Sequence, residues 1–176
     1  HTAMGEYQYV VANGYHGNWV DMVCNSSYNG TGPTWLITER DGRHFMESMR
    51  IEKNRPHRMF PTLETGKHQW KDYEVSVSVR RLSQKGMAGL VFSMNHSIDT
   101  LVFYLDGKDK AAVAYRHKGE VQVLKEVSFP HGCDQEYRLK VDWDGRIAKV
   151  YVDDQELCRV EDDLVARGGK VGISAA

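Results

Sequence analysis

Apolar and polar residues alternate one by one over several stretches of this chain. In residues 73–79, Tyr and Val alternate with Glu and Ser, and in residues 137–143, Tyr, Leu, Val and Trp alternate with Arg, Lys and Asp. A period of two is typical of a β-strand with one buried face, because successive side chains point to opposite sides of a sheet. These stretches therefore predict strands, and the chain carries almost no helical pattern.

Further strands are expected where apolar residues cluster between turn signals, at 88–94, 100–107, 111–119 and 148–152. Asp-Gly and Lys-Gly pairs, which favour tight turns, stand at 106–107, 118–119 and 144–145. Successive strands joined by tight turns form antiparallel sheets. The sequence thus predicts an all-β fold, an antiparallel two-sheet β-sandwich of the jelly-roll type.

The first third of the chain is less regular. Thr34–Thr38 predicts a strand, Asp41-Gly42 a hairpin turn, and Phe45–Lys53 the returning strand. Residues 54–69, basic and containing proline, predict a long loop of the kind that is often functional. Near the other end, 160–166 is expected to hold at most a short helical turn.

Length and charge narrow the range of functions. The 176 residues suffice for one domain with a sizeable core, and His1–Gly5 looks like an expression-tag remnant, so we expect this remnant and one β-sandwich domain over 6–176. A net charge of −1 argues against a nucleic-acid partner. No window approaches the roughly 18 apolar residues that span a bilayer, so no membrane partner is expected.

The sequence lacks a recognisable catalytic motif. A glycosidase needs two carboxylates at a fixed separation, and no strand carries such a pair on one face. Glu39 and Asp41 fall at a turn, and the acidic residues of 153–156 and 161–163 are expected in turns or loops. The two acidic clusters near 153–163 leave bound Ca²⁺ as an alternative to no cofactor at all.

The three cysteines and eight histidines match no metal motif. Cys24, Cys133 and Cys158 are expected to be unpaired thiols, with one disulfide and one free thiol as the alternative. No catalytic residue and no resident metal ion is therefore predicted, and a binding module is favoured over an enzyme.

A sugar site needs an aromatic platform and planar polar groups, and strand alternation suggests where these could meet. Leu101, Phe103 and Leu105 should face one side of their strand, and Val102 and Tyr104 the other; in the next strand Val113 and Tyr115 should oppose Ala112, Ala114 and Arg116. With Leu90 and Phe92 in the core, Val91 and Ser93 would face outward. Tyr104, Arg116 and Ser93 could then share the solvent-facing side of one sheet, where Gly89, Ala112 and Ala114 keep a shallow groove open.

Three residues outside these strands are further candidates for carbohydrate contact: Trp35, Arg50 and Glu47. Packing in the core or at an edge is the alternative for Trp35, and it is also what we expect of Trp70. An ordinary sheet surface with scattered polar groups remains the alternative for Tyr104 and Arg116.

A set of short strand motifs resembles the concanavalin A-like, laminin G-like domains, and among them modules similar to the fructan-binding carbohydrate-binding family 66. The motifs lie at 70–75, 88–92, 137–141, 150–156 and 169–174. The resemblance covers residues 69–175 and extends to domains appended to bacterial glycoside-active enzymes and ADP-ribosylglycohydrolase-like proteins. It implies a two-sheet jelly roll with a ligand on the concave sheet or at its rim. It also implies a module tethered to a parent catalytic domain, which would raise the module's local concentration at the substrate.

The sequence therefore favours a non-catalytic carbohydrate-binding module, secreted or at the cell surface of a bacterium, that targets a parent enzyme to a polysaccharide or oligosaccharide. Two alternatives stay open. One is a small glycoside hydrolase or lyase of the same fold, which would turn over a glycan. The other is a laminin G-like protein-interaction module, which would bind no glycan and expose a sizeable apolar patch.

Overall fold

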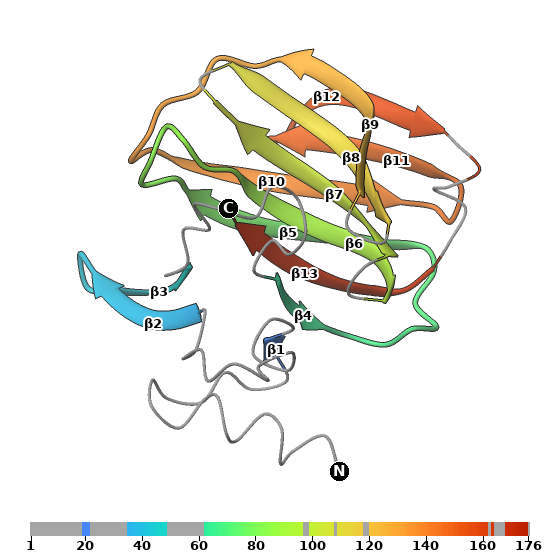
Figure 1. Ribbon diagram of the computed structural model, residues 1–176, viewed down its shortest axis with the longest axis horizontal. Helices are drawn as coiled ribbons and strands as arrows, with labels where there is room; N and C mark the ends of the chain where they lie inside the picture. Colours follow the sequence, from blue (N-terminus) through green and yellow to red (C-terminus); the bar gives the residue numbers. More distant parts are fainter. Residues whose placement is uncertain are drawn as a thin grey trace.

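The computed structural model describes residues 19–21, 35–48, 62–96, 99–107, 109–117, 120–161, 163 and 168–175, and this part of the chain consists of strands joined by turns and loops (Figure 1). In chain order the strands are β1 (Val20–Asp21), β2 (Trp35–Arg40), β3 (Arg43–Ser48), β4 (Thr62–Thr65), β5 (Tyr73–Arg80), β6 (Ala88–His96), β7 (Asp99–Asp106), β8 (Lys110–His117), β9 (Glu120–Ser128), β10 (Glu136–Trp143), β11 (Ile147–Val152), β12 (Gln155–Glu161) and β13 (Lys170–Ala175).

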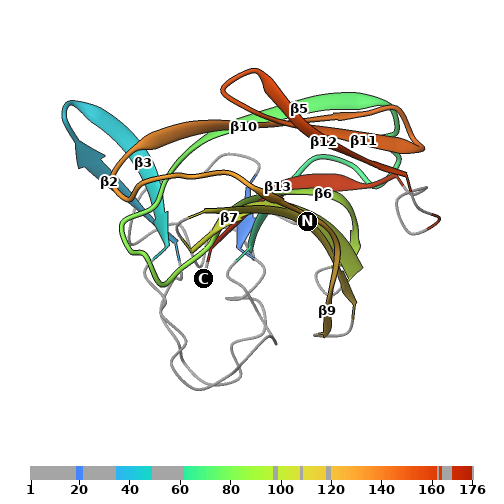
Figure 2. The same ribbon diagram turned by 90° about the horizontal axis from the view of Figure 1, so that it is seen from above.

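Two antiparallel sheets stack on each other. The larger has seven strands in the order β1-β4-β13-β6-β7-β8-β9, and the smaller has four in the order β12-β11-β10-β5. Figure 2 shows them as two layers, with the seven-stranded sheet curling away from the smaller sheet toward β9. The side of the seven-stranded sheet that faces away from the four-stranded sheet is called the concave face below.

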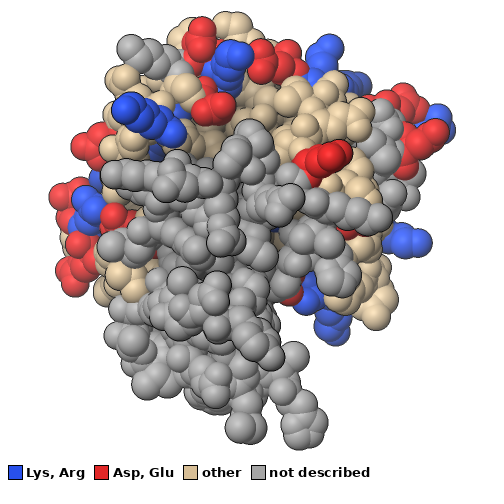
Figure 3. All heavy atoms as spheres, in the orientation of Figure 1, with Lys and Arg blue, Asp and Glu red and all other residues tan. Residues whose placement is uncertain are grey.

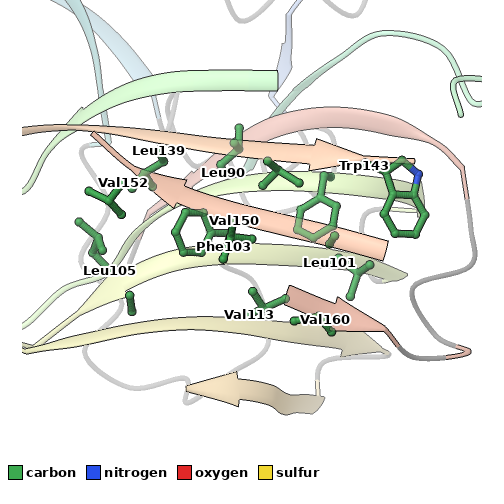
Figure 4. Close-up of a cluster of buried hydrophobic side chains, with 14 of the residues drawn as sticks. Leu90, Leu101, Phe103, Leu105, Val113, Leu139, Trp143, Val150, Val152 and Val160 are labelled. Carbon is green, nitrogen blue, oxygen red and sulfur yellow. The ribbon is translucent and has the colours of Figure 1, made fainter. Parts of the chain in front are cut away.

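The hydrophobic core fills the space between the sheets (Figure 4). It is built from alternate residues of facing strands, among them Leu90, Phe92, Leu101, Phe103, Leu105, Val113, Leu139, Val141, Trp143, Val150, Val152 and Val160. The rings of Phe92 and Trp143 meet across the two sheets with centroids 6.2 Å apart. Since each fully buried side chain of this size contributes about 1.5–3 kcal/mol, the alternation that predicts the strands also accounts for the stacking of the sheets.

The predicted fold class is confirmed, and the alternating stretches form β5–β8, β10 and β11. Three strands were not identified from the sequence. β4 lies within the expected loop at 54–69, so that part of the expectation is wrong. β12 lies where acidic turns and a short helical turn were expected, and β9 follows the predicted turn at 118–119.

Two β-bulges interrupt the regular pairing at the edges of the sheets. Between β8 and β9 the register shifts at Val113/Ala114, and between β11 and β12 it shifts at Val150/Tyr151. Each bulge sits between the outermost strand of a sheet and its neighbour. A bulge leaves an extra residue in one strand, which breaks the alternation of the sequence and increases the local twist.

The hairpin β2–β3 forms a separate two-stranded sheet beside the sandwich (Figures 1 and 2). Its predicted turn is confirmed: Asp41 and Gly42 have φ of +54° and +70°, as a tight hairpin turn requires. Arg43 donates to the Glu136 carboxylate at 2.9 and 3.1 Å. The Phe45 ring lies under two guanidinium groups, those of Arg43 at 5.2 Å and Arg80 at 5.3 Å. These contacts attach the hairpin to the four-stranded sheet.

Cys133 and Cys158 are both half-buried free thiols, and Cys24 lies outside the described residues. Burial raises the pKa of the Cys158 thiol. A search of the described part of the chain for a helix of membrane-spanning length and hydropathy finds none.

Candidate functional site

The two faces of β7 and β8 are divided as the alternation predicts. Leu101, Phe103 and Leu105 of β7 point into the core, as do Val113 and Tyr115 of β8. Val102 and Tyr104 lie on the opposite, concave face, where Val102 packs in a second apolar cluster. Because β7 and β8 pair with Val102 opposite Ala114 and Tyr104 opposite Ala112, residues 112, 114 and 116 share that face.

Arg116 is on the predicted face but is not exposed to solvent, so its expected exposure is wrong. Only 4% of its surface is accessible. Its Nη2 donates to the Thr62 hydroxyl of β4 at 3.3 Å, although β13, β6 and β7 lie between the two strands in the sheet. The curvature of the sheet permits this long reach. Burial lowers the pKa of Arg116 to about 10, so the guanidinium remains charged at neutral pH.

Tyr104 is a half-buried ring at the boundary between the apolar cluster and solvent. It packs against the cluster of Met87, Val91, Met94 and Val102. Burial is the main cause of its raised pKa, and the charges of Asp106 and Glu126 raise it further. Tyr104 thus keeps its phenol proton and offers both an apolar ring and a hydrogen-bonding hydroxyl.

The residues directly opposite Tyr104 in the neighbouring strands are small. Gly89 of β6 lies on one side and Ala112 of β8 on the other. A Cβ added to Gly89 would come within 2.9 Å of the Tyr104 Cβ and of the Phe103 carbonyl oxygen, so no larger residue fits there without a shift. The ring therefore lies in a row with no bulky neighbour on either side.

The same row ends in a charged pair on β9 and β8. Glu126 lies opposite Ala112, and its carboxylate is 3.2 Å from Lys110 Nζ. In the next row Val123 lies opposite Ala114 and is 49% exposed. Tyr104, Val123, Glu126 and Lys110 together give this side of the concave face an apolar floor with hydrogen-bonding groups at its margin, and we call these four residues the Tyr104 surface.

A second ion pair lies on β4 and β13. Lys170 Nζ is 2.6 Å from Glu64 Oε1, and the Glu64 side chain is almost fully buried. Sequence reasoning missed this pair, because Glu64 belongs to the stretch that was expected to be a loop. The stretch Thr-Leu-Glu-Thr at 62–65 contains a single apolar residue, so no periodic signal identifies this strand.

Ser93 does not join Tyr104 and Arg116 on an exposed surface. It is buried, has a positive φ of +50°, and sits in an irregular stretch of β6 between Phe92 and His96. Its backbone N–H donates to the Tyr73 hydroxyl of the four-stranded sheet at 2.9 Å. Met94, rather than Ser93, packs with Val91 in the second apolar cluster. Burial raises the pKa of Tyr73 to about 12, so this hydroxyl stays protonated.

The candidates from the hairpin region are placed apart from Tyr104. Trp35 is buried within the structure, which agrees with the alternative of core packing. Glu47 accepts two hydrogen bonds from Arg40, at 3.1 and 3.0 Å, and lies opposite Leu36. Arg50 lies outside the described residues. The structure thus brings together Tyr104 and Arg116, but not Trp35 or Glu47 with them.

The acidic clusters considered for Ca²⁺ face basic side chains. Asp154 lies within 4.0 Å of Arg138 and 3.8 Å of Lys140, and Glu156 is 2.6 Å from Arg159. Over the residues that the structure describes, no three His, Cys, Asp or Glu side chains converge as metal ligands would. On the side of the molecule shown in Figure 3, acidic and basic side chains are interspersed around the described margin.

The fold of the described residues is a concanavalin A-like jelly roll. No protein-family model and no curated protein matches the sequence. Among solved structures, the carbohydrate-binding module CBM66 from Bacillus subtilis superimposes with a TM-score of 0.67 and 17% identity, over 90% of this chain and 87% of that one. This likeness confirms the resemblance predicted from the strand motifs.

Two other structures have the same fold. A Bacillus subtilis protein of unknown function with a galectin-like fold gives a TM-score of 0.56 at 12% identity, over 81% of this chain and 80% of that one. A prokaryotic β-1,3-1,4-glucanase from a mouse hindgut metagenome gives 0.50 at 16% identity, over 65% of this chain and 56% of that one. The fold is therefore used by a binding module and by an enzyme, and function has to be argued from the site.

Proposed function

We propose that this chain is a carbohydrate-binding module that holds a polysaccharide or oligosaccharide on the Tyr104 surface. The observation that carries the proposal is the row Gly89–Tyr104–Ala112–Glu126. It presents a half-exposed aromatic ring between two small residues, with a carboxylate and an ammonium group at its end. This arrangement suits a sugar, which has an apolar C–H face to lie on the ring and hydroxyls to bond to the charged pair.

Arg116 has a supporting part in this proposal. Since it is buried and bonded to Thr62, it links β8 to β4 on the concave face rather than touching the ligand. Glu64 is the one buried carboxylate among the described residues, and it is paired with Lys170. A retaining glycosidase uses two carboxyl groups about 5–5.5 Å apart, so this arrangement favours binding over hydrolysis.

The likeness to the Bacillus subtilis carbohydrate-binding module supports the class of ligand. The wider role follows from the same proposal: the module acts outside the cell or at its surface, without catalysis of its own. A parent catalytic domain in the same polypeptide would be held at its polysaccharide substrate, which raises the effective concentration of the enzyme there.

The test is electrophoresis in native gels cast with levan, inulin, mixed-linkage β-glucan or xylan, with calorimetry on each polymer that retards the protein. Tyr104→Ala is expected to weaken binding about tenfold, equal to about 1.4 kcal/mol, with the fold intact. Tyr151→Ala is the matched control, because Tyr151 is a half-buried tyrosine on the outer face of the four-stranded sheet. Binding by wild type but equally by Tyr104→Ala would move the site elsewhere, and release of sugar products would establish an enzyme instead.

A further inference from the structure

Trp70 is the one strongly exposed tryptophan among the described residues, with 41% of its surface accessible. It lies between β4 and β5, at the rim of the sandwich. The sequence predicts that it packs in the core or at an edge, and the structure places it at the edge. A single exposed apolar residue is ordinary in itself. The evidence for a binding site is therefore the way in which neighbouring residues hold the indole.

One face of the indole lies flat on Gly66. A Cβ added to Gly66 would come within 2.5–2.9 Å of three atoms of the six-membered ring. Gly66 has a φ of +98°, which other residues rarely adopt, so the backbone there suits glycine alone. Tyr73 meets the indole from the side, with ring centroids 6.4 Å apart and planes tilted by 59°. The exposed part of Trp70 is consequently its other face.

The segment that carries the indole is held by backbone contacts on two sides. The Trp70 N–H donates to the Lys67 carbonyl at 3.2 Å, which closes a turn, and the Gly169 N–H donates to the Trp70 carbonyl at 2.9 Å. A Cβ added to Gly168 would come within 2.5 Å of that carbonyl oxygen, so the two segments touch closely. The ring is therefore oriented before any ligand arrives, which lowers the entropy cost of binding.

We propose that Trp70 forms a second carbohydrate subsite, at which one further sugar ring of the same polysaccharide stacks on the free face of the indole. The exposed side chains of His68 and Lys71 flank it and can bond to sugar hydroxyls. The inference rests on the proposed function for the class of ligand, but not on the location of the first site. An indole face is the largest flat apolar surface that a side chain offers to the C–H face of a sugar.

The two subsites are too far apart for a short ligand. From the strand register, Gly66 lies about 13 Å along β4 from Thr62, and β4 is three strand spacings, about 14 Å, from β7, which carries Tyr104. The path between them along the surface of the sheet is thus on the order of 20 Å. A disaccharide can occupy either subsite but cannot join them, whereas a polymer can engage both.

Calorimetry with the retarding polymer and with its own disaccharide tests the second subsite. Trp70→Ala is expected to lower affinity for the polymer about fivefold to tenfold, while Trp70→Phe keeps most of it because the flat ring remains. Leu82→Ala is the matched control, since Leu82 is 48% exposed in the loop at the other end of β5 and tests for non-specific stickiness. Thermal unfolding of each variant separates misfolding from loss of the platform.

Fluorescence gives an independent measurement. Trp70 should dominate quenching by acrylamide, and the polymer should protect it in wild type but give no such protection in Trp70→Phe. If Trp70→Ala binds the polymer as wild type does while Tyr104→Ala loses binding, the second subsite is disproved and the proposed function stands. If wild type binds none of the four polymers, both the second subsite and the proposed function are overturned.

Discussion

The outer faces of the two sheets differ in how many charged side chains they carry and in how these are paired. On the four-stranded sheet, charges of both signs alternate across the strands and pair with each other: Lys149 lies 3.2 Å from Asp142, Lys140 lies 3.7 Å from Glu74, and Lys140 also sits 4.4 Å above the centre of the Tyr151 ring. On the concave face of the seven-stranded sheet, small and apolar residues fill most positions, and Arg116 is buried.

This difference separates a solvated, charge-paired surface from the surface proposed to bind a ligand. A ligand on the four-stranded sheet would have to displace ion pairs and remove their water, which costs free energy that new contacts must offset. On the concave face the small and apolar neighbours Ala112, Ala114 and Val102 are buried. The half-buried Tyr104 ring and the exposed Val123 reach solvent there, with the Lys110–Glu126 pair beside them. The four-stranded sheet thus has an outer face of paired charges in water, whereas on the concave face few of the described side chains reach solvent.

The largest difference in stability between the two faces is expected when an arginine on each face is replaced by alanine. Arg116→Ala should lower the free energy of unfolding by about 3 kcal/mol, since it removes a buried side chain and its hydrogen bond to Thr62. Arg138→Ala, on the outer face of the four-stranded sheet, should change it little, because half of that side chain is exposed. Urea titrations measure both, and equal midpoints for the two variants would contradict the comparison.

A smaller loss of stability is expected when the glycine beside Tyr104 is replaced. Gly89→Ala should cost about 2 kcal/mol of stability, because the added methyl group would collide with Tyr104 and the Phe103 carbonyl. Gly132→Ala is the control, since a Cβ there meets its nearest neighbour, Gln135 Oε1, at an ordinary 3.5 Å. Thermal unfolding compares the two variants. A Gly89→Ala protein as stable as Gly132→Ala would mean that the concave face accommodates the added methyl group without a collision.

The smallest loss of stability is expected for a substitution on the outer face of the four-stranded sheet. Lys149→Ala removes an exposed ion pair with Asp142, so the unfolding midpoint should fall slightly at low salt. In 1 M NaCl the screening length is about 3 Å, and the difference from wild type should disappear. A loss that persists at high salt would show that Lys149 stabilises the sheet by packing rather than by charge.

The sequence predicted the fold where one face of a strand is buried and the other is solvated. β5 and β10 alternate cleanly because the core takes every second residue. β7 and β8 are buried on both faces, and they were predicted from apolar residues between turn signals. β9 does not alternate, since the bulge opposite Val113/Ala114 adds a residue to the strand, and the two side chains that pack against the core, Leu124 and Val127, are three residues apart. β4 is short, and its Thr62 and Glu64 are polar yet buried, which a hydrophobic pattern does not reveal.

The candidate site was predicted in part for the same reason. Alternation alone placed Tyr104 and Arg116 on one face, and the structure agrees. It could not predict that Arg116 is buried, because its partner Thr62 is 54 residues away in sequence and on a strand that was not identified. Nor could it show the exposed face of Trp70, which depends on the backbone of Gly66.

The bulged edges of the sheets have a consequence for how copies of this domain can crowd together. A flat, regular edge strand offers its backbone to a neighbouring molecule, and joining of such edges leads to aggregation. The outermost strands of the two sheets are β1, β9, β12 and β5. Two of them, β9 and β12, are bulged against their neighbours and carry charges, such as Glu126 and Arg159. Copies bound along one polymer chain, as proposed above, would therefore be hindered from joining through these two edges.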